Sequence, residues 1–122
     1  MRDADAALGG LDGVVNAAGV VAFGPFADLS DDALDELVAV DFTGPLKAIR
    51  AALPHLLEGG GSVVTVGSRA AETAGAGMAA YAVSKSAVHA LTRVLAAENR
   101  DRGVRFNCVL PGVIDTPANR EA

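Results

Sequence analysis

Short apolar runs alternate with long helical patterns along this chain, and the alternation restricts the fold to one architecture. The apolar runs lie in segments 11–19, 62–68 and 104–110, and the helical patterns occupy about residues 30–57 and 80–102. Strand, helix, strand, helix, strand implies two successive right-handed crossovers, which place both helices on the same face of a sheet. We therefore predict an α/β fold with a three-stranded parallel sheet and two long flanking helices.

Local signals set the ends of the two predicted helices. Ser30 is suited to cap the first helix, and Asp31 and Asp32 follow in the first turn, where the helix dipole favours acidic side chains. Glycines in segment 58–61 end this helix, and Gly103 ends the second one. The expected boundaries therefore agree with the helical periodicity.

The predicted strands carry apolar residues on both faces, although the helices cover only one. Val14 and Val15 are adjacent in the first strand, and Val63 and Val64 are adjacent in the second. Strands of this kind are usually covered on both faces, and the first strand also has an open edge. We therefore expect residues 1–122 to form a single partial domain that lacks the N-terminal half of a doubly wound fold.

Composition excludes several classes of function. The net charge is −5, and the ten Lys and Arg residues are dispersed, which argues against a nucleic-acid or anionic membrane partner. No apolar run is long enough for a membrane span, and the first residues lack the core of a signal peptide. Cys108 is the only cysteine, so an internal disulfide is excluded and a reducing compartment, the cytoplasm, is expected.

The stretch YAVSK places Tyr81 and Lys85 four residues apart on the second helix, where the two side chains can share a face. The simplest interpretation is a surface pair without chemistry. The alternative is a proton-transfer site, because a nearby cation lowers the pKa of a phenol from its usual value near 10. Ser68 ends a parallel strand at its carboxyl end, where ligands bind in open α/β sheets, and could donate to the same substrate oxygen.

Four motifs in order resemble the catalytic half of a short-chain dehydrogenase/reductase, a family with a Rossmann-like fold. NAAG at 16–19 is similar to the family's Asn-Asn-Ala-Gly turn, and Ser68 precedes Tyr81 by the usual thirteen residues. YAVSK is similar to the tyrosine–lysine signature, and PGVIDT at 111–116 is similar to the Pro-Gly turn and following threonine. The resemblance spans almost the whole chain.

This resemblance implies an NAD(P)-dependent oxidoreductase that transfers a hydride between the cofactor and a secondary alcohol or ketone. By analogy, Tyr81 is the general acid/base, and Ser68 orients and polarises the substrate oxygen. Lys85 holds the nicotinamide ribose and favours the phenolate. The segment that would distinguish NAD from NADP is expected to lie outside this chain, so both cofactors stay open.

The resemblance also implies two groups of cofactor-binding residues. Pro111, Gly112, Ile114 and Thr116 would line the nicotinamide, with Thr116 and the backbone at Ile114 meeting its carboxamide. The residues beside the adenosine portion would be Asn16, Ala17 and Gly19. For Asn16, a structural hydrogen bond between strands is an equally good interpretation.

Asp41 departs from the family pattern, which usually has asparagine at this position with a main-chain carbonyl that holds a relay water. Pro45 has no N–H to bond that carbonyl, and Gly44 weakens the same turn, so we predict a kink that leaves the carbonyl free. The alternative is an ordinary proline kink whose only role is to fit the helix around the core. A carboxylate near Lys85 would stabilise the ammonium and weaken its effect on the phenol.

A rival hypothesis is a truncated or degenerate fragment without activity, acting at most as an interaction module. In the family that the chain resembles, the two long helices form the main subunit interface, which implies a homo-oligomer here.

The remaining candidates give weaker signals. We expect no metal site, because His55 and His89 are single and lack ligand spacing, and we expect both to be solvated. Segment 75–80 is expected to be a loop beside the substrate.

Overall fold

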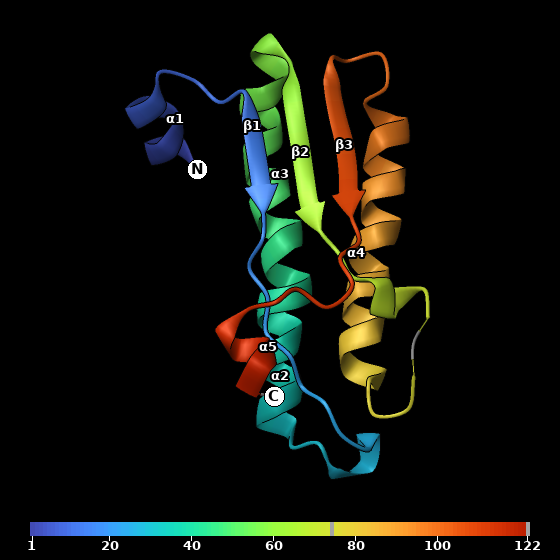
Figure 1. Cartoon of the computed structure of the whole chain (residues 1–122). Helices are drawn as coiled ribbons and strands as arrows, with labels where there is room; N and C mark the ends of the chain where they lie inside the picture. Colours follow the sequence, from blue (N-terminus) through green and yellow to red (C-terminus); the bar gives the residue numbers. More distant parts are fainter. Residues whose placement is uncertain (74, 122) are drawn as a thin grey trace.

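A computed structural model describes residues 1–73 and 75–121, which contain the predicted parallel sheet (Figure 1). Its strands are β1 (Gly13–Asn16), β2 (Gly61–Val66) and β3 (Val104–Val109), in the order β1-β2-β3. Both pairings are parallel, with Val14 opposite Val63 and Val63 opposite Phe106. The predicted fold class is confirmed, and the carboxyl ends of all three strands lie at one edge of the sheet.

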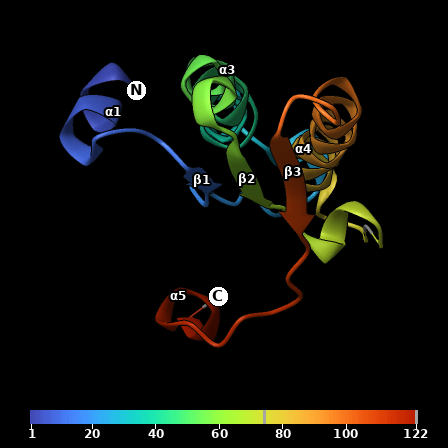
Figure 2. The same cartoon turned by 90° about the horizontal axis from the view of Figure 1, so that it is seen from above.

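The helices α3 (Gly44–Gly59) and α4 (Ala79–Glu98) cover one face of the sheet, as Figure 2 shows. A third helix, α2 (Asp31–Val38), precedes α3 and packs against α4. Ser30 caps α2, because its Oγ accepts a hydrogen bond of 3.1 Å from the backbone N–H of Ala33. Gly60 follows α3 and has a positive φ angle of 82°. Gly103 follows the turn after α4 and has a positive φ angle of 78°. These conformations favour glycine. The expected glycines end α3, whereas α4 ends at Glu98, before the predicted end near Arg102, and Gly103 closes the turn that follows.

Where the sequence predicted a kink before Pro45, the structure has a π-helical turn, η2 (Ala39–Thr43). The backbone N–H of Gly44 bonds the carbonyl of Ala39, five residues earlier, where an α-helix would use a residue four positions back. A π turn inserts one extra residue into a helix, and such turns frequently occur at functional sites. The insertion lies at Asp41, whose side chain is fully buried.

The core lies between the sheet and the helix face that packs on it. Ala52 and Leu56 of α3 are fully buried against Val63 of β2, and Phe106 of β3 is 6% exposed. Burying a side chain of the size of Leu, Val or Phe contributes about 1.5–3 kcal/mol to the stability of the fold. The remaining buried members of the core are Leu11, Ile49 and Val104. This core holds the helices and strands that carry the candidate site.

The opposite face of the sheet has little cover. Val15 is 71% exposed there, and on β3 the same face carries Arg105 and Asn107, which are also exposed.

Two short helices were not expected from the sequence, α1 (Arg2–Leu8) and α5 (Pro117–Glu121), and neither contains a buried residue. Two 3₁₀ turns, η1 (Phe26–Asp28) and η3 (Arg69–Ala71), complete the elements of the described part. Within residues 1–73 and 75–121, no helix has the length and hydropathy needed to cross a membrane.

Candidate active site

Ser68 lies just beyond the carboxyl end of β2 and begins the turn η3. Its side chain is 8% exposed, and its Oγ accepts a hydrogen bond of 3.1 Å from the backbone N–H of Ala70. Two backbone bonds hold the surrounding segment to β3 and to the residues that follow it: Gly67 N–H donates to the Val109 carbonyl at 2.8 Å, and Arg69 N–H donates to the Pro111 carbonyl at 3.0 Å. Because the Oγ uses a lone pair toward Ala70, its hydrogen stays available for another acceptor.

Tyr81 lies in the first turn of α4, at the same edge of the sheet. Its ring packs edge-to-face against Phe23, with centroids 5.6 Å apart and planes at 74°. This arrangement is among the preferred geometries for aromatic pairs. The contact fixes the ring and leaves one side of Tyr81 facing a cavity. Phe23 was not predicted from the sequence, because it follows β1 in a segment without periodicity.

Lys85 follows Tyr81 by one helical turn and is buried, with 6% of its surface exposed. Its Nζ lies 5.9 Å from the centroid of the Tyr81 ring and donates a hydrogen bond of 3.0 Å to the Val66 carbonyl. The first distance is within the range of a cation–π contact. The carbonyl at the end of β2 therefore holds the ammonium beside the phenol.

One cavity of about 600 Å³ joins the two hydroxyl-bearing residues, and four predicted site residues line it: Ser68, Tyr81, Pro111 and Gly112. Its wall also contains residues that the sequence did not single out: Val21, Phe23, Arg69, Ala70, Thr73, Met78, Val113 and Asn119. Met78 belongs to the loop that was expected beside the substrate. A carbonyl compound in this cavity could meet a hydroxyl donor and a phenol together.

The remaining predicted residues lie outside that lining. Ile114 is 53% exposed, and its carbonyl accepts from the backbone N–H of Thr116 at 2.9 Å and from Nδ2 of Asn119 at 2.8 Å. Thr116 Oγ1 accepts from the backbone N–H of Asn119 at 3.2 Å. These bonds order the segment that leads into α5. They also show that Asn119 supports the predicted nicotinamide segment, a role without a sequence signal.

Asn16 ends β1 and is half-buried, whereas Ala17 and Gly19 are exposed just beyond the strand. Within the described residues, Asn16 Nδ2 is buried without a hydrogen-bond partner. An unpaired buried donor is costly, which favours a group that completes it. The alternative interpretation of Asn16, a structural hydrogen bond between strands, is not supported for Nδ2, because no residue of a neighbouring strand accepts from this atom.

Asp41 is fully buried and lies close to Lys85, and both side chains approach Gly19. A Cβ placed on Gly19 would lie 3.5 Å from Lys85 Nζ and 3.6 Å from Asp41 Oδ1. Asp41 Oδ1 accepts a hydrogen bond of 2.7 Å from the backbone N–H of Val20, while no described residue satisfies Oδ2. Burial raises the pKa of the Asp41 carboxyl, and the Val20 bond and the charge of Lys85 oppose that rise. The predicted proximity of Asp41 and Lys85 is therefore present.

The expectation that both histidines are solvated is wrong for His89. Its side chain is 5% exposed because the helix face that carries it packs against the segment after β2. His55 is half-buried, with Nδ1 3.4 Å from Asp5 Oδ2. In the part of the chain that the structure describes, no three His, Cys, Asp or Glu side chains gather as a metal-binding group.

The profile of the short chain dehydrogenases matches residues 1–122, the entire chain. A 2-(S)-hydroxypropyl-CoM dehydrogenase 3 from Xanthobacter autotrophicus is 42% identical over 115 residues, covering 93% of this chain and 45% of its own. An uncharacterized NAD-dependent oxidoreductase from Mycobacterium tuberculosis is 39% identical over 112 residues, covering 90% of this chain and 41% of its own.

The solved structures include a protein described as a short-chain alcohol dehydrogenase from Sinorhizobium meliloti. It superimposes with a TM-score of 0.89 at 31% identity, over 94% of this chain and 46% of its own. The chain therefore belongs to the short-chain dehydrogenase family of oxidoreductases, whose members typically use NAD(P). It spans 41–50% of the length of the curated relatives reported for it.

Proposed function

We propose that this chain carries the catalytic part of an NAD(P)-dependent oxidoreductase that interconverts a secondary alcohol and a ketone. The observation that carries the proposal is the shared cavity: Ser68 and Tyr81 line the same space, and Lys85 lies beneath the Tyr81 ring. Family membership supports the reaction class. A relative named for a 2-hydroxypropyl compound supports a secondary alcohol as the substrate class.

Each residue has a distinct role in the reduction direction. The Ser68 hydroxyl donates a hydrogen bond to the substrate carbonyl oxygen, since its lone pair already accepts from Ala70. Tyr81 gives its proton to the same oxygen, and Lys85 stabilises the charge left on the phenol. When bound, a reduced nicotinamide would supply the hydride to the substrate carbon.

Several residues fit a dinucleotide at the carboxyl edge of the sheet. Asn16 Nδ2 is an unpaired buried donor there, and the exposed turn at Ala17 and Gly19 leaves the backbone open to a ligand. Lys85 would bind the ribose hydroxyls. The segment that would hold the nicotinamide ring contains Pro111, Gly112, Ile114 and Thr116. NAD and NADP both fit this proposal.

Asp41 is assigned a positioning role in the proposed site. The π turn sets its peptide apart from ordinary α-helical bonding, which supports a relay through its main-chain carbonyl. Its carboxyl lies close enough to Lys85 for their charges to interact. In this proposal the Lys85 ammonium interacts both with the Tyr81 phenol and with the Asp41 carboxyl.

The decisive experiment is nucleotide binding and turnover by the purified chain. We expect NADH or NADPH fluorescence to change saturably, and a panel of ketones to be reduced in its presence. Failure of both, together with association to a longer homologue, would support the second candidate, an interaction module without activity.

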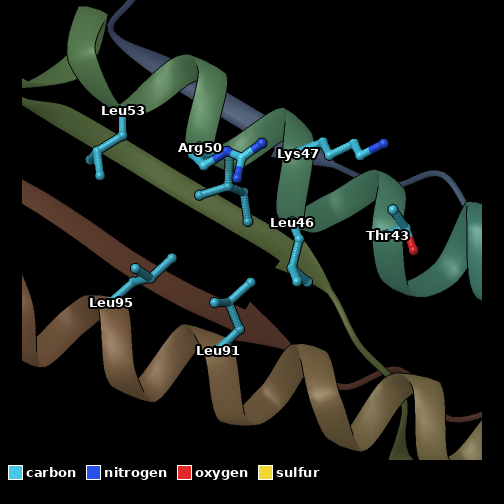
Figure 3. A pocket seen from close by; sticks show the side chains of 8 residues that line it. Thr43, Leu46, Lys47, Arg50, Leu53, Leu91 and Leu95 are labelled. Atoms are coloured by element: carbon cyan, nitrogen blue, oxygen red, sulfur yellow. The ribbon is translucent and has the colours of Figure 1, made fainter.

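The two long helices favour a second copy of this chain as a partner. Figure 3 shows leucines of α3 and α4 that point into the space between the helices, where Leu46, Leu53, Leu91 and Leu95 line a groove of about 400 Å³. Val83 and Val94 of α4 are 69% and 53% exposed. Light scattering should give a dimer or larger species, and Leu91→Arg should shift it to the monomer.

A single cysteine also favours a reducing compartment such as the cytoplasm.

A further inference from the structure

His89 lies on α4 one turn beyond Lys85 and reaches the backbone of Ser68. Its Nε2 accepts a hydrogen bond of 3.2 Å from the Ser68 backbone N–H, and both groups are buried. Its Nδ1 lies 3.1 Å from Oε1 of Glu72, whose side chain is 59% exposed. A chain of hydrogen bonds therefore joins a surface carboxylate, a buried imidazole and the peptide of Ser68.

These contacts define the protonation state of the imidazole. A backbone N–H can only donate, so Nε2 must carry a free lone pair. A carboxylate can only accept, so Nδ1 must carry the hydrogen. His89 is therefore neutral with the proton on Nδ1 in this geometry. Glu72 fixes the tautomer, as a carboxylate does for histidines whose other nitrogen must act as an acceptor or ligand.

Gly67 gives the imidazole room to approach the strand end. A Cβ at this position would lie 2.2 Å from His89 Nε2 and 2.7 Å from Cys108 Sγ, closer than real contacts allow. Burial raises the pKa of the Cys108 thiol, which keeps this neighbour uncharged. The imidazole is thus enclosed by the backbone of Gly67, the thiol of Cys108 and the carboxylate of Glu72.

We infer that His89 is a positioning residue, which fixes the peptide of Ser68 so that the Ser68 hydroxyl faces the cavity shared with Tyr81. The Ser68 backbone is tied on one side by the imidazole, and its Oγ is tied to the N–H of Ala70. With both bonds made, the hydroxyl has one hydrogen left to direct toward a substrate. The catalytic consequence rests on the proposed function, whereas the hydrogen-bond chain is a property of the fold.

The spectroscopic test needs neither cofactor nor substrate. In the ¹⁵N-labelled chain at neutral pH, long-range correlation spectra should show His89 with a protonated Nδ1 and an unprotonated Nε2. The Ser68 amide should exchange slowly with solvent. Protonation of Nε2, or a rapidly exchanging Ser68 amide, would overturn the inference even if the chain proved inactive.

Two variants separate positioning from simple packing. His89→Gln can keep an acceptor near the Ser68 N–H, whereas His89→Leu fills the space without one. We expect His89→Leu to lower kcat on the order of tenfold or more with nucleotide affinity unchanged, and His89→Gln to restore most of that loss. Equal kcat for both variants and the parent chain would overturn the inference.

Glu72→Ala provides a further variant if His89→Leu fails to fold, because the carboxylate lies largely at the surface. It should release the tautomer, so that part of the His89 population carries its proton on Nε2 and the Ser68 amide exchanges faster. Glu72→Gln is the matched control, since its amide oxygen can still accept from Nδ1. An unchanged His89 spectrum in Glu72→Ala would count against the inference.

Discussion

The Lys85 ammonium lies 5.9 Å from the centroid of the Tyr81 ring while it donates to the Val66 carbonyl at the end of β2. The strand end therefore fixes the distance between cation and phenol. Helical spacing alone would leave a long lysine side chain free to turn toward solvent. The hydrogen bond to Val66 therefore holds the ammonium near the phenol, as the proposed proton transfer requires.

Tyr81→Phe should remove turnover and leave the site intact. The substitution deletes the hydroxyl but keeps the ring that packs against Phe23 at 5.6 Å. We expect kcat to fall by about 100-fold or more, the usual contribution of a general acid or base. Steady-state rates and a nucleotide titration check this, because affinity for NADH or NADPH should change little. A retained rate would refute the acid/base assignment.

Lys85→Met should weaken both nucleotide binding and turnover. The variant keeps an unbranched side chain of similar length but loses the ammonium and leaves the Val66 carbonyl without its donor. An unsatisfied buried acceptor costs about 1–3 kcal/mol, so the midpoint of urea unfolding should also fall. Lys47→Met is a control on an exposed lysine. Equal effects of the two variants on nucleotide affinity would argue against the assigned role of Lys85.

Asp41→Asn should increase stability at neutral pH. Burial raises the pKa of Asp41 above the ordinary 3.8, so the folded state binds more protons than the unfolded state between these two values. The contribution of this carboxyl to stability therefore falls as pH rises through that window. Asparagine removes the charge, so its advantage over aspartate should be present at neutral pH and fade toward acid pH.

Urea unfolding at neutral pH and at pH 3.8 would measure this effect. The difference in stability between the two proteins should be smaller at the lower pH, where a larger share of the Asp41 carboxyl is protonated in the fold. A difference that stays constant or grows toward acid pH would contradict the assigned direction of the shift.

Gly67→Ala should disturb the site through the His89 imidazole. The new Cβ would meet Nε2 at 2.2 Å, so the ring must move away from the Ser68 N–H. We expect a lower melting temperature and a loss of turnover. Gly59→Ala is the matched control, because nothing lies within 4 Å of a Cβ there. Similar melting temperatures for the two variants would show that the close approach at Gly67 is not required.

Much of the sheet and of the cavity could be predicted from the sequence. The order of apolar runs and helical patterns determined the parallel sheet, because only one handedness of crossover is common. Ser68 and Tyr81 lie at the two ends of a single loop after a parallel strand, so their convergence on one cavity also followed. The cap at Ser30 rests on local chemistry and was equally accessible.

Other features depend on packing that no local pattern encodes. His89 reads as a polar helix position, and its burial depends on η3 folding back over that face of α4. Phe23 and Asn119 belong to segments without periodicity, and their contacts arise only once β1 and β3 are aligned. A proline predicts that a helix is interrupted but not whether the result is a kink or the observed π turn at Asp41.

The most direct test of the central claim is a double-mutant cycle with Ser68→Ala and Tyr81→Phe, measured as kcat/KM for ketone reduction. Both hydroxyls are proposed to act on one substrate oxygen, so their losses should not multiply. We predict that the double variant is little worse than Tyr81→Phe alone, as for residues that act as a unit. Independent, multiplicative losses, or no nucleotide-dependent rate in the parent chain, would contradict the account.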